Sequence, residues 1–495
     1  MLRVALHQLR RKRKVILEHA PEHGPDPVAF PARLHRAETT LANDLWRLLH
    51  APSRLATRPA AARFIVDPPV SGDGRELDSR QRDAVRMALS ERVSILTGGP
   101  GCGKSFTLRT IAETVVRCGG KVTLSAPTGR AAKRLVELTG LPATTIHRPV
   151  RPKPGTDAVV TLFDDTDPLQ ADLVVVDEAS MLDVRLADEL VAKIPEGAHL
   201  LLVGDIDQQP SIGSGCVLRD LLAVPDIAHV RLERVYRQGP GSSISTGADA
   251  VRRGQMPTIG GEFWLVPVTD PANIPGIVVD VATRRLPAAY GLDPRDVQVL
   301  CPGRARDTGA LNVGRLIQDQ LNPHTAGEAQ HWSDDRAFRP GDKVMPARNN
   351  YDKGTAGVFN GSAGTVTSVD VDDRTVTVTL DDGEAVIYGF DELDELAHAY
   401  AITVHRSQGS EYAYVVIALS SAAGPFLLQR NLLYTAITRA KTMVVIVGSH
   451  DALRRAIRNS AEPRNTRLTT RFSDPADHEP TPEPPTDTDA QLSAF

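Results

Sequence analysis

The sequence predicts an α/β protein with two parallel β-sheets of the nucleotide-binding type and a small antiparallel β-barrel inserted in the second. In two blocks, residues 77–234 and 297–447, short apolar strands alternate with helical segments, a pattern that predicts sheets covered by helices on both faces. Within the second block, residues 364–388 alternate apolar and polar side chains between aspartate-rich turns, which predicts antiparallel hairpins. The chain has 495 residues, 41% of them hydrophobic, and can bury several cores.

The same patterns predict where each part lies. We expect a small accessory region at 1–75, a first parallel-sheet domain at 76–235, a second at 236–325 and 395–455, the barrel at 326–394 and an acidic, proline-rich, disordered tail at 456–495. Strands are expected at 94–97, 122–126, 173–176 and 200–203 in the first domain, and at 297–300, 414–419 and 443–447 in the second. In the barrel they are expected at 364–369, 375–380 and 385–388.

A phosphate-binding loop follows the first of these strands. The loop reads G-x-x-x-x-G-K-S and leads into a helical segment. Its glycines let backbone N–H groups close around phosphate oxygens, Lys104 reaches the β- and γ-phosphates, and the hydroxyl of Ser105 can ligate Mg²⁺. A nucleoside triphosphate is the expected ligand, bound by Gly98, Gly99, Pro100, Gly101, Cys102, Gly103, Lys104, Ser105 and Phe106.

Acidic and basic residues elsewhere complete a candidate hydrolytic site. The strand at 173–176 ends in Asp177, a candidate metal ligand, and Glu178, a candidate general base. Gln208 follows another strand and can either sense the γ-phosphate or belong to a hydrophilic turn. Arg237 and Arg439 are candidates for stabilising transition-state charge, although most arginines only solvate a surface.

Composition limits the remaining classes of protein. No apolar run is long enough to span a bilayer and the start lacks the apolar core of a secretory signal, so we expect no membrane association and a cytoplasmic location. The four cysteines lie far apart and predict neither a zinc site nor disulfides. The net charge is −4, but the tail is acidic and the rest is close to neutral, so charge alone does not decide whether the chain binds nucleic acid.

A series of segments then resembles the motifs of RecD-like superfamily 1 DNA helicases, in the family's order. The segments lie at 77–81, 98–105, 125–132, 145–148, 176–181, 204–208, 236–238, 403–409 and 434–440, and the resemblance covers roughly residues 30–450. It implies two RecA-like domains with a Src-homology-3-like (SH3-like) barrel, bound ATP and Mg²⁺, and movement along DNA in the 5′-to-3′ direction. Single-stranded and tailed duplex DNA are the implied substrates, with other repair or recombination proteins as further partners.

The resemblance also implies roles for single residues. Gln81 would read the adenine, whereas Gln208, Arg237 and Arg439 would couple the γ-phosphate to closure of the cleft between the domains. A track for single-stranded DNA would be lined by Pro127, Thr128, Thr145, His147, Thr403, His405 and Gln408. From its sequence position alone, His405 can equally be a core histidine. A short strand-separating pin is expected within 149–168.

Two alternatives remain open at this point. The region before Leu77 leaves no room for the helix-hairpin-helix module of longer family members, so the chain can instead be a nucleotide-gated DNA-binding protein without unwinding activity. It can also be the helicase part of a conjugative relaxase-type protein, although no relaxase-like tyrosine pair or histidine cluster precedes the phosphate loop.

Overall fold

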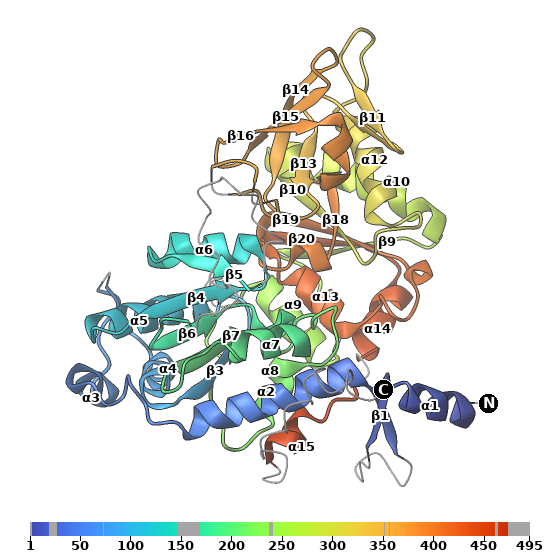
Figure 1. The fold of residues 1–495 in the computed structure, drawn as a ribbon. Helices are drawn as coiled ribbons and strands as arrows, with labels where there is room; N and C mark the ends of the chain where they lie inside the picture. Colours follow the sequence, from blue (N-terminus) through green and yellow to red (C-terminus); the bar gives the residue numbers. More distant parts are fainter. Residues whose placement is uncertain are drawn as a thin grey trace.

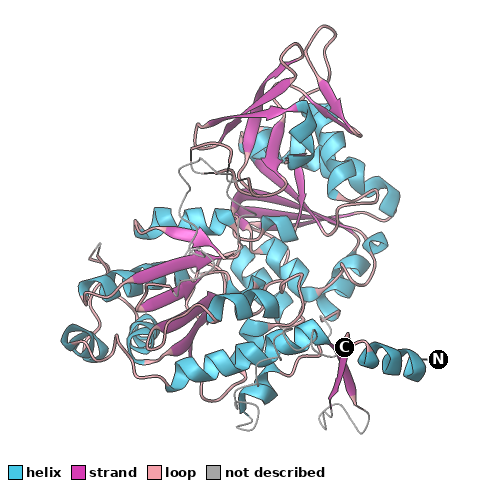
Figure 2. Ribbon diagram, in the orientation of Figure 1, coloured by secondary structure: helices cyan, strands magenta, loops and turns pink. Residues whose placement is uncertain are grey.

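The computed structural model describes residues 2–18, 27–72, 74–146, 169–236, 241–350, 352–355, 357–460 and 464–473. It contains two parallel sheets covered by helices and, at one end, a small antiparallel sheet (Figure 2). The predicted fold class is therefore confirmed. Among the described helices, none is both long and apolar enough to cross a membrane.

The first sheet has six parallel strands in the order β5-β4-β6-β7-β3-β8. Their bounds are β3 Val93–Gly98, β4 Val122–Ala126, β5 Ala143–Thr145, β6 Leu173–Val176, β7 His199–Gly204 and β8 Ala228–Leu232. Every residue of β3, β6 and β7 is buried, as expected for central strands covered on both faces. The covering helices are α4 Ser79–Ser90, α5 Lys104–Arg117, α6 Gly129–Thr139, α7 Val184–Val191 and α8 Val217–Leu222.

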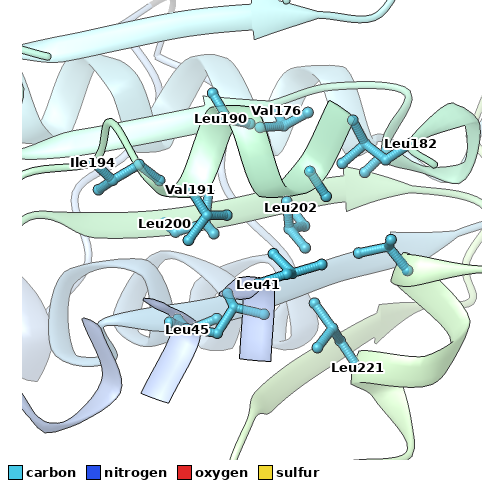
Figure 3. Close-up of a cluster of buried hydrophobic side chains, with 14 of the residues drawn as sticks. Leu41, Leu45, Val176, Leu182, Leu190, Val191, Ile194, Leu200, Leu202 and Leu221 are labelled. Atoms are coloured by element: carbon cyan, nitrogen blue, oxygen red, sulfur yellow. The ribbon is translucent and has the colours of Figure 1, made fainter. Parts of the chain in front are cut away.

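One face of this sheet is completed by the N-terminal part of the chain. Helix α2 (Ala32–His50) lies along α7 and inserts Leu41, Leu45 and Leu48 into the same core as β6 and β7 (Figure 3). Before α2 come α1 (Leu2–Arg11) and the hairpin of β1 (Val15–Glu18) with β2 (Val28–Pro31), and after it comes α3 (Pro59–Val66). Much of the predicted accessory region is thus integral to the core of the first domain.

The second sheet has five parallel strands in the order β18-β10-β19-β20-β9. These are β9 Phe263–Pro267, β10 Val297–Cys301, β18 Ala401–Thr403, β19 Tyr412–Leu419 and β20 Ala440–Gly448. Its helices are α9 Ser243–Arg252, α10 Ile274–Asp280, α11 Leu286–Tyr290, α12 Ala310–Leu321, α13 Arg430–Ile437 and α14 His450–Arg458. In Figure 1 this domain lies between the first domain and the barrel.

The barrel sheet has the order β16-β15-β14-β13-β17 and is antiparallel throughout. Its strands are β13 Lys343–Pro346, β14 Gly364–Asp370, β15 Thr375–Leu380, β16 Ala385–Gly389 and β17 Leu396–His398, preceded by the hairpin of β11 His331–Ser333 and β12 Arg336–Phe338. The expected end of the barrel at residue 394 is too early, because β17 pairs with β13 and lies beyond it.

The end of the chain returns to the first domain. Helix α15 (Leu468–Ser473) packs on α2 and α8, with Leu468 and Phe472 in the core around α2. The prediction of a disordered tail from residue 456 is therefore wrong for this helix and for the end of α14. The acidic, proline-rich composition that motivated that prediction starts only after Ser473, whereas 464–472 supplies two apolar anchors and three arginines.

Candidate nucleotide and DNA sites

The phosphate loop joins β3 to α5. Gly101 and Gly103 have φ of +73° and +84°, which glycine adopts without steric cost, and α5 begins at Lys104. The Lys104 ammonium donates to the carbonyl oxygens of Gly98 at 2.6 Å and Gly99 at 3.0 Å. Ser105 lies in the first turn of α5, where free backbone N–H groups and the helix dipole favour an anion.

The two predicted acidic residues lie at the carboxyl end of β6. Asp177 accepts a hydrogen bond from the backbone N–H of Glu178 at 2.9 Å, and Glu178 adopts the left-handed conformation at φ +53°. Burial, with the Glu178 charge adding to it, raises the pKa of Asp177 to about 6, while Lys104 acts in the opposite direction. A bound cation would stabilise the negative charge of a buried carboxylate that lies beside a second carboxylate. Mg²⁺ prefers oxygen ligands such as carboxylate and hydroxyl groups. Asp177 and Ser105 therefore fit a magnesium ion.

The second domain reaches the phosphate loop through Tyr434 on α13. Its buried hydroxyl donates to Asp205 Oδ2 at 3.0 Å, and a Cβ on Gly99 would lie 3.3 Å from the same hydroxyl. Burial and the neighbouring Asp205 raise the pKa of Tyr434 well above its ordinary value, so the phenol stays protonated and donates. This contact joins the carboxyl end of the first sheet, where Asp205 follows β7, to helix α13 of the second domain.

A cavity of about 550 Å³ opens beside this contact. Its walls come from the phosphate loop, from the exit of β8 and from α9 and α13 of the second domain. They include Gly99, Pro100, Cys102, Asp207, Arg231, Val235, Ser242, Thr246, Asp249, Arg252, Tyr434 and Thr438. Arg231 and Arg252 place two cations in this wall, balanced by Asp207, whose Oδ2 lies 3.0 Å from Arg231 Nη2. The sequence reasoning missed both arginines, because nothing in their local sequence separates them from surface arginines.

Gln81 and Tyr236 lie at the edge of the loop. The buried side chain of Gln81 accepts from Asp78 N at 3.0 Å in a capping box at the start of α4, and its Nε2 lies 2.7 Å from the Cβ position of Gly103. Tyr236 donates its backbone N–H to Gly101 O at 2.8 Å and its hydroxyl to Asp78. The structure thus places a tyrosine ring beside Gln81, and the arginine that follows it, Arg237, lies outside the described residues.

The two remaining coupling candidates are buried. Gln208 donates from Nε2 to Asp205 Oδ2 at 3.4 Å, which connects it to the Tyr434 contact. The Arg439 guanidinium donates to Ser410 O at 3.1 Å and to Thr435 O at 3.2 Å. It therefore lies within the second domain and is not among the described residues that line the 550 Å³ cavity.

The residues of the expected DNA track lie on both domains. Pro127 and Thr128 follow β4 at the start of α6 and Thr145 ends β5, whereas Thr403 ends β18 and His405 follows it. Gly409 joins the two halves, because a Cβ on it would lie 3.5 Å from Thr128 Oγ1. Gln408 also reaches the first domain, donating to Gln209 O at 2.8 Å. His147 and the expected pin at 149–168 lie outside the described residues.

A cavity of about 730 Å³ lies next to Thr403 and His405, between the second domain and the barrel. Its wall is rich in arginine and includes Arg304, Arg306, Arg315, Arg336, Arg339 and Arg406, together with Trp332 and, from the first domain, Ile212. Burial and the neighbouring Arg304 and Arg336 lower the pKa of Arg406. Six arginines outnumber the three aspartates of this wall, Asp319, Asp335 and Asp394, and this excess of positive charge beside an exposed indole suits a phosphate backbone with stacked bases.

The barrel also contacts α6 of the first domain. A Cβ on Gly129 would overlap the ring of Phe359, and Arg130 Nη1 donates to Gly361 O at 3.0 Å. Lys133 forms an ion pair with Asp382, and in Figure 1 α6 lies below the edge of the barrel that carries β16. The first domain, the second domain and the barrel therefore meet around Thr128.

Comparison with known proteins agrees with this arrangement. Residues 76–261 match the family described as AAA domain, residues 311–380 the ATP-dependent RecD-like DNA helicase SH3 domain, and residues 398–447 the UvrD-like helicase C-terminal domain. The ATP-dependent RecD2 DNA helicase of Deinococcus radiodurans is 36% identical over 441 residues, which cover 88% of this chain and 57% of that protein.

Two further similarities cover more of the compared protein. The RecBCD enzyme subunit RecD of Mycolicibacterium smegmatis is 33% identical over 421 residues, 77% of this chain and 73% of that subunit. Among solved structures, a Pif1 helicase from Bacteroides in complex with ADP-AlF3 and ssDNA aligns over 79% of this chain and 95% of that one, with a TM-score of 0.49 and 18% identity. The sequence relatives confirm the resemblance seen in the motifs, and the chain belongs to the RecD-like family of ATP-dependent DNA helicases.

Proposed function

We propose that this chain hydrolyses Mg-ATP between its two RecA-like domains and uses the resulting domain motion to move 5′-to-3′ along single-stranded DNA and separate a duplex ahead of it. The observation that carries the proposal is the Tyr434 contact, because it ties the phosphate loop to the second domain at Asp205. Binding or hydrolysis of the nucleotide at the phosphate loop therefore changes contacts of both domains. The 5′-to-3′ direction rests on membership of the family.

We assign the nucleotide-site residues as follows. Lys104 and the loop amides hold the phosphates, Ser105 and Asp177 hold Mg²⁺, and Glu178 orients and deprotonates the attacking water. Gln81 contacts the adenine beside Tyr236. When bound, the metal supplies charge stabilisation to the phosphoryl group. Gln208, Arg237 and Arg439 report the state of the γ-phosphate, with Arg439 leaving its present carbonyl partners as the cleft closes.

We assign the DNA track to the polar residues on both domains and to the arginine-rich cavity. Pro127, Thr128, Thr145, His147, Thr403, His405 and Gln408 contact the strand, and the arginines attract its phosphates without reading sequence. Single-stranded and tailed duplex DNA are the proposed ligands, with other repair or recombination proteins as partners. We propose the two RecA-like domains and the barrel predicted from the sequence, with the barrel extended through β17, the second domain extended through α14, and α2 and α15 assigned to the first domain.

Strand displacement tests this proposal directly. The protein is given 5′-tailed, 3′-tailed and blunt duplexes, each with and without Mg-ATP, and release of the labelled strand is followed. We expect ATP-dependent release from the 5′-tailed duplex alone. Release from the 3′-tailed duplex alone would refute the direction, and nucleotide-dependent binding without release from any duplex would favour the DNA-binding alternative.

Two variants test the hydrolytic assignment in a phosphate-release assay. The Lys104→Ala variant should hydrolyse ATP about a hundredfold or more slowly than the wild type, because it lacks the fixed positive charge that stabilises the transferring phosphoryl group. Glu178→Gln should lose turnover while still binding a fluorescent ATP analogue. Arg454→Ala, an exposed change on α14, is the matched control and should hydrolyse ATP at the wild-type rate. An active Glu178→Gln protein would remove Glu178 from the mechanism.

A further inference from the structure

The loop that follows β7, residues 208–216, reaches from the Asp205–Tyr434 contact to the arginine-rich cavity. At its start, Gln208 is bonded to Asp205, which also accepts from Tyr434. At its tip, the side chain of Ile212 is 78% exposed and lines the arginine-rich cavity together with Thr403 and His405. One short segment therefore connects the nucleotide side of the molecule to the proposed DNA track.

The second domain holds only the first half of this loop. Gln209 donates its backbone N–H to Thr435 Oγ1 at 2.8 Å, and its carbonyl oxygen accepts from Gln408 Nε2 at 2.8 Å. Its far end is joined to α7, where Val184 N donates to Ser214 O at 3.0 Å. Between these points, Ser211 Oγ donates to Gly213 O at 3.2 Å and to Gly215 O at 3.5 Å, and the same carbonyl oxygens also accept from a charged side chain outside the turn.

That side chain is Arg464, which lies between α14 and α15. Its Nη1 donates to Ser211 Oγ at 3.1 Å, to Gly215 O at 2.7 Å and to Gly213 O, while its Nη2 donates to Ser211 O. A single guanidinium thus closes around three residues of the turn. Arginine suits this position, because its rigid fork presents several donors in one plane, whereas a lysine ammonium is a single point.

The local sequence fits such a fixed turn. A Cβ on Gly213 would overlap the carboxylate of Asp183, and Gly215 has a φ of +91°. Both positions therefore require glycine, which leaves this backbone without side-chain packing of its own. Arg464 adds a charged restraint to the Ser211 hydrogen bonds, and α15, held by Arg471 on Glu38 at 2.9 Å, keeps that part of the chain on the first domain.

We propose that Arg464 is a positioning residue that fixes the turn 211–215, so that Ile212 presents a defined surface to the DNA strand and contact with DNA is transmitted to Gln208. Contact with DNA then moves Gln208 relative to Asp205, and ATP hydrolysis responds. The inference rests on the proposed helicase function for its DNA partner, whereas the restraint on the turn stands by itself.

The test uses the full-length chain as wild type, Arg464→Ala, Arg464→Lys and the control Arg454→Ala. ATP hydrolysis is measured without DNA and with increasing single-stranded oligothymidylate. We expect both Arg464 variants to lower the ratio of DNA-stimulated to DNA-free hydrolysis about fivefold and to require more oligothymidylate for half-maximal stimulation. Arg454→Ala should match the wild type. Full recovery in Arg464→Lys would show that charge alone matters and would overturn the inference.

Hydrogen exchange of the peptide covering 208–216 separates this inference from the proposed function. Amides of the turn should exchange at least tenfold faster in Arg464→Ala than in the wild type, with the β6 and β7 peptides unchanged. Unchanged exchange of the turn, or a fall in DNA-free and DNA-stimulated hydrolysis at a constant ratio, would overturn the inference. A wild-type protein whose hydrolysis does not respond to oligothymidylate would instead refute the proposed function.

Discussion

Replacing Arg471 with alanine should strongly destabilise the first domain, because this arginine is the buried centre of a charge cluster between the two ends of the chain. Its side chain is 2% exposed. It donates from Nε to Glu38 Oε1 at 2.9 Å and from its terminal nitrogens to both oxygens of Glu18, at 3.1 and 2.6 Å. The same guanidinium lies 5.7 Å from the centroid of the Phe30 ring.

The loss of stability can be estimated from the partners that the two carboxylates keep after Arg471 is removed. Without Arg471, the buried Glu38 carboxylate still accepts from Thr466 Oγ1 at 2.9 Å and Arg467 N at 3.0 Å, which are both neutral donors, whereas Glu18 keeps His35 and Arg467. Removing one partner of a buried ion pair costs about 3–5 kcal/mol, because the other charge stays desolvated. Since Glu18 is partly exposed, we expect about 3 kcal/mol, or a melting temperature about 6–12 °C lower for a domain of this size.

Thermal and urea unfolding at pH 7 measure this loss. The double variant Arg471→Met with Glu38→Gln should recover most of it, since it leaves no unpaired charge beside α2. Burial raises the pKa of Glu18, but its hydrogen bond and charge interaction with Arg471 outweigh this and lower the pKa below 4.5. The Glu18 contribution is therefore present above pH 4.5 and is lost as the pH falls through the lowered pKa, so part of the deficit should disappear in acid. A single variant within 2 °C of wild type, or a double variant no better than the single, would refute this reasoning.

Three further changes test other parts of the structure. Tyr434→Phe removes the hydroxyl that donates to Asp205 and should lower the ATP hydrolysis rate about tenfold, equivalent to about 1.4 kcal/mol in activation free energy. If this variant hydrolyses ATP at the wild-type rate, the proposed role of the contact is wrong. Burial, followed by the charges of Asp44 and Glu189, raises the pKa of Asp188 to about 7, so this residue stabilises the fold below pH 3.8 and that stability is lost as the pH rises through 7. Asp188→Asn should therefore be about 1–2 kcal/mol more stable than wild type at pH 8, after discounting for partial exposure, and should converge with it near pH 4; a difference independent of pH would exclude Asp188 as its source. Gly129→Val should cost about 1–3 kcal/mol in thermal unfolding by overlapping Phe359, and the loss should shrink in a Phe359→Ala background.

The sequence predicts best those elements whose local pattern agrees with their final environment. The expected strands at 122–126 and 173–176 coincide with β4 and β6, because each is rich in β-branched or apolar residues and, apart from the partly buried Val122, is buried on both faces. Weak or partly exposed patterns are missed. Strand β5 reads Ala-Thr-Thr and β8 carries His229 and Arg231, so only their pairing with β4 and β3 makes them strands.

The candidate site likewise contains residues that the sequence predicts and residues that only the folded structure reveals. The phosphate loop and its neighbouring carboxylates are local in sequence, and their geometry follows from a strand, a turn and a helix. Tyr434, Arg252 and Arg464 reach the site from elements far along the chain, and only tertiary packing brings them there. The local sequence around Arg252 and Arg464 carries no signal of that destination, whereas Tyr434 begins the 434–440 segment that resembles a helicase motif.

The return of α15 to the first domain changes how the second domain is connected. Residues 241–460 leave the first domain after β8 and rejoin it at Arg464, so in topological terms the second domain is an insertion with two covalent attachments. A domain joined to its neighbour by one linker can rotate about any axis. A domain joined by two linkers rotates mainly about the axis that passes through both linkers. For the nucleotide-driven movement proposed above, we therefore expect a hinge with a preferred axis, and cutting the chain after α14 should release that constraint without removing any of the described residues that line either cavity.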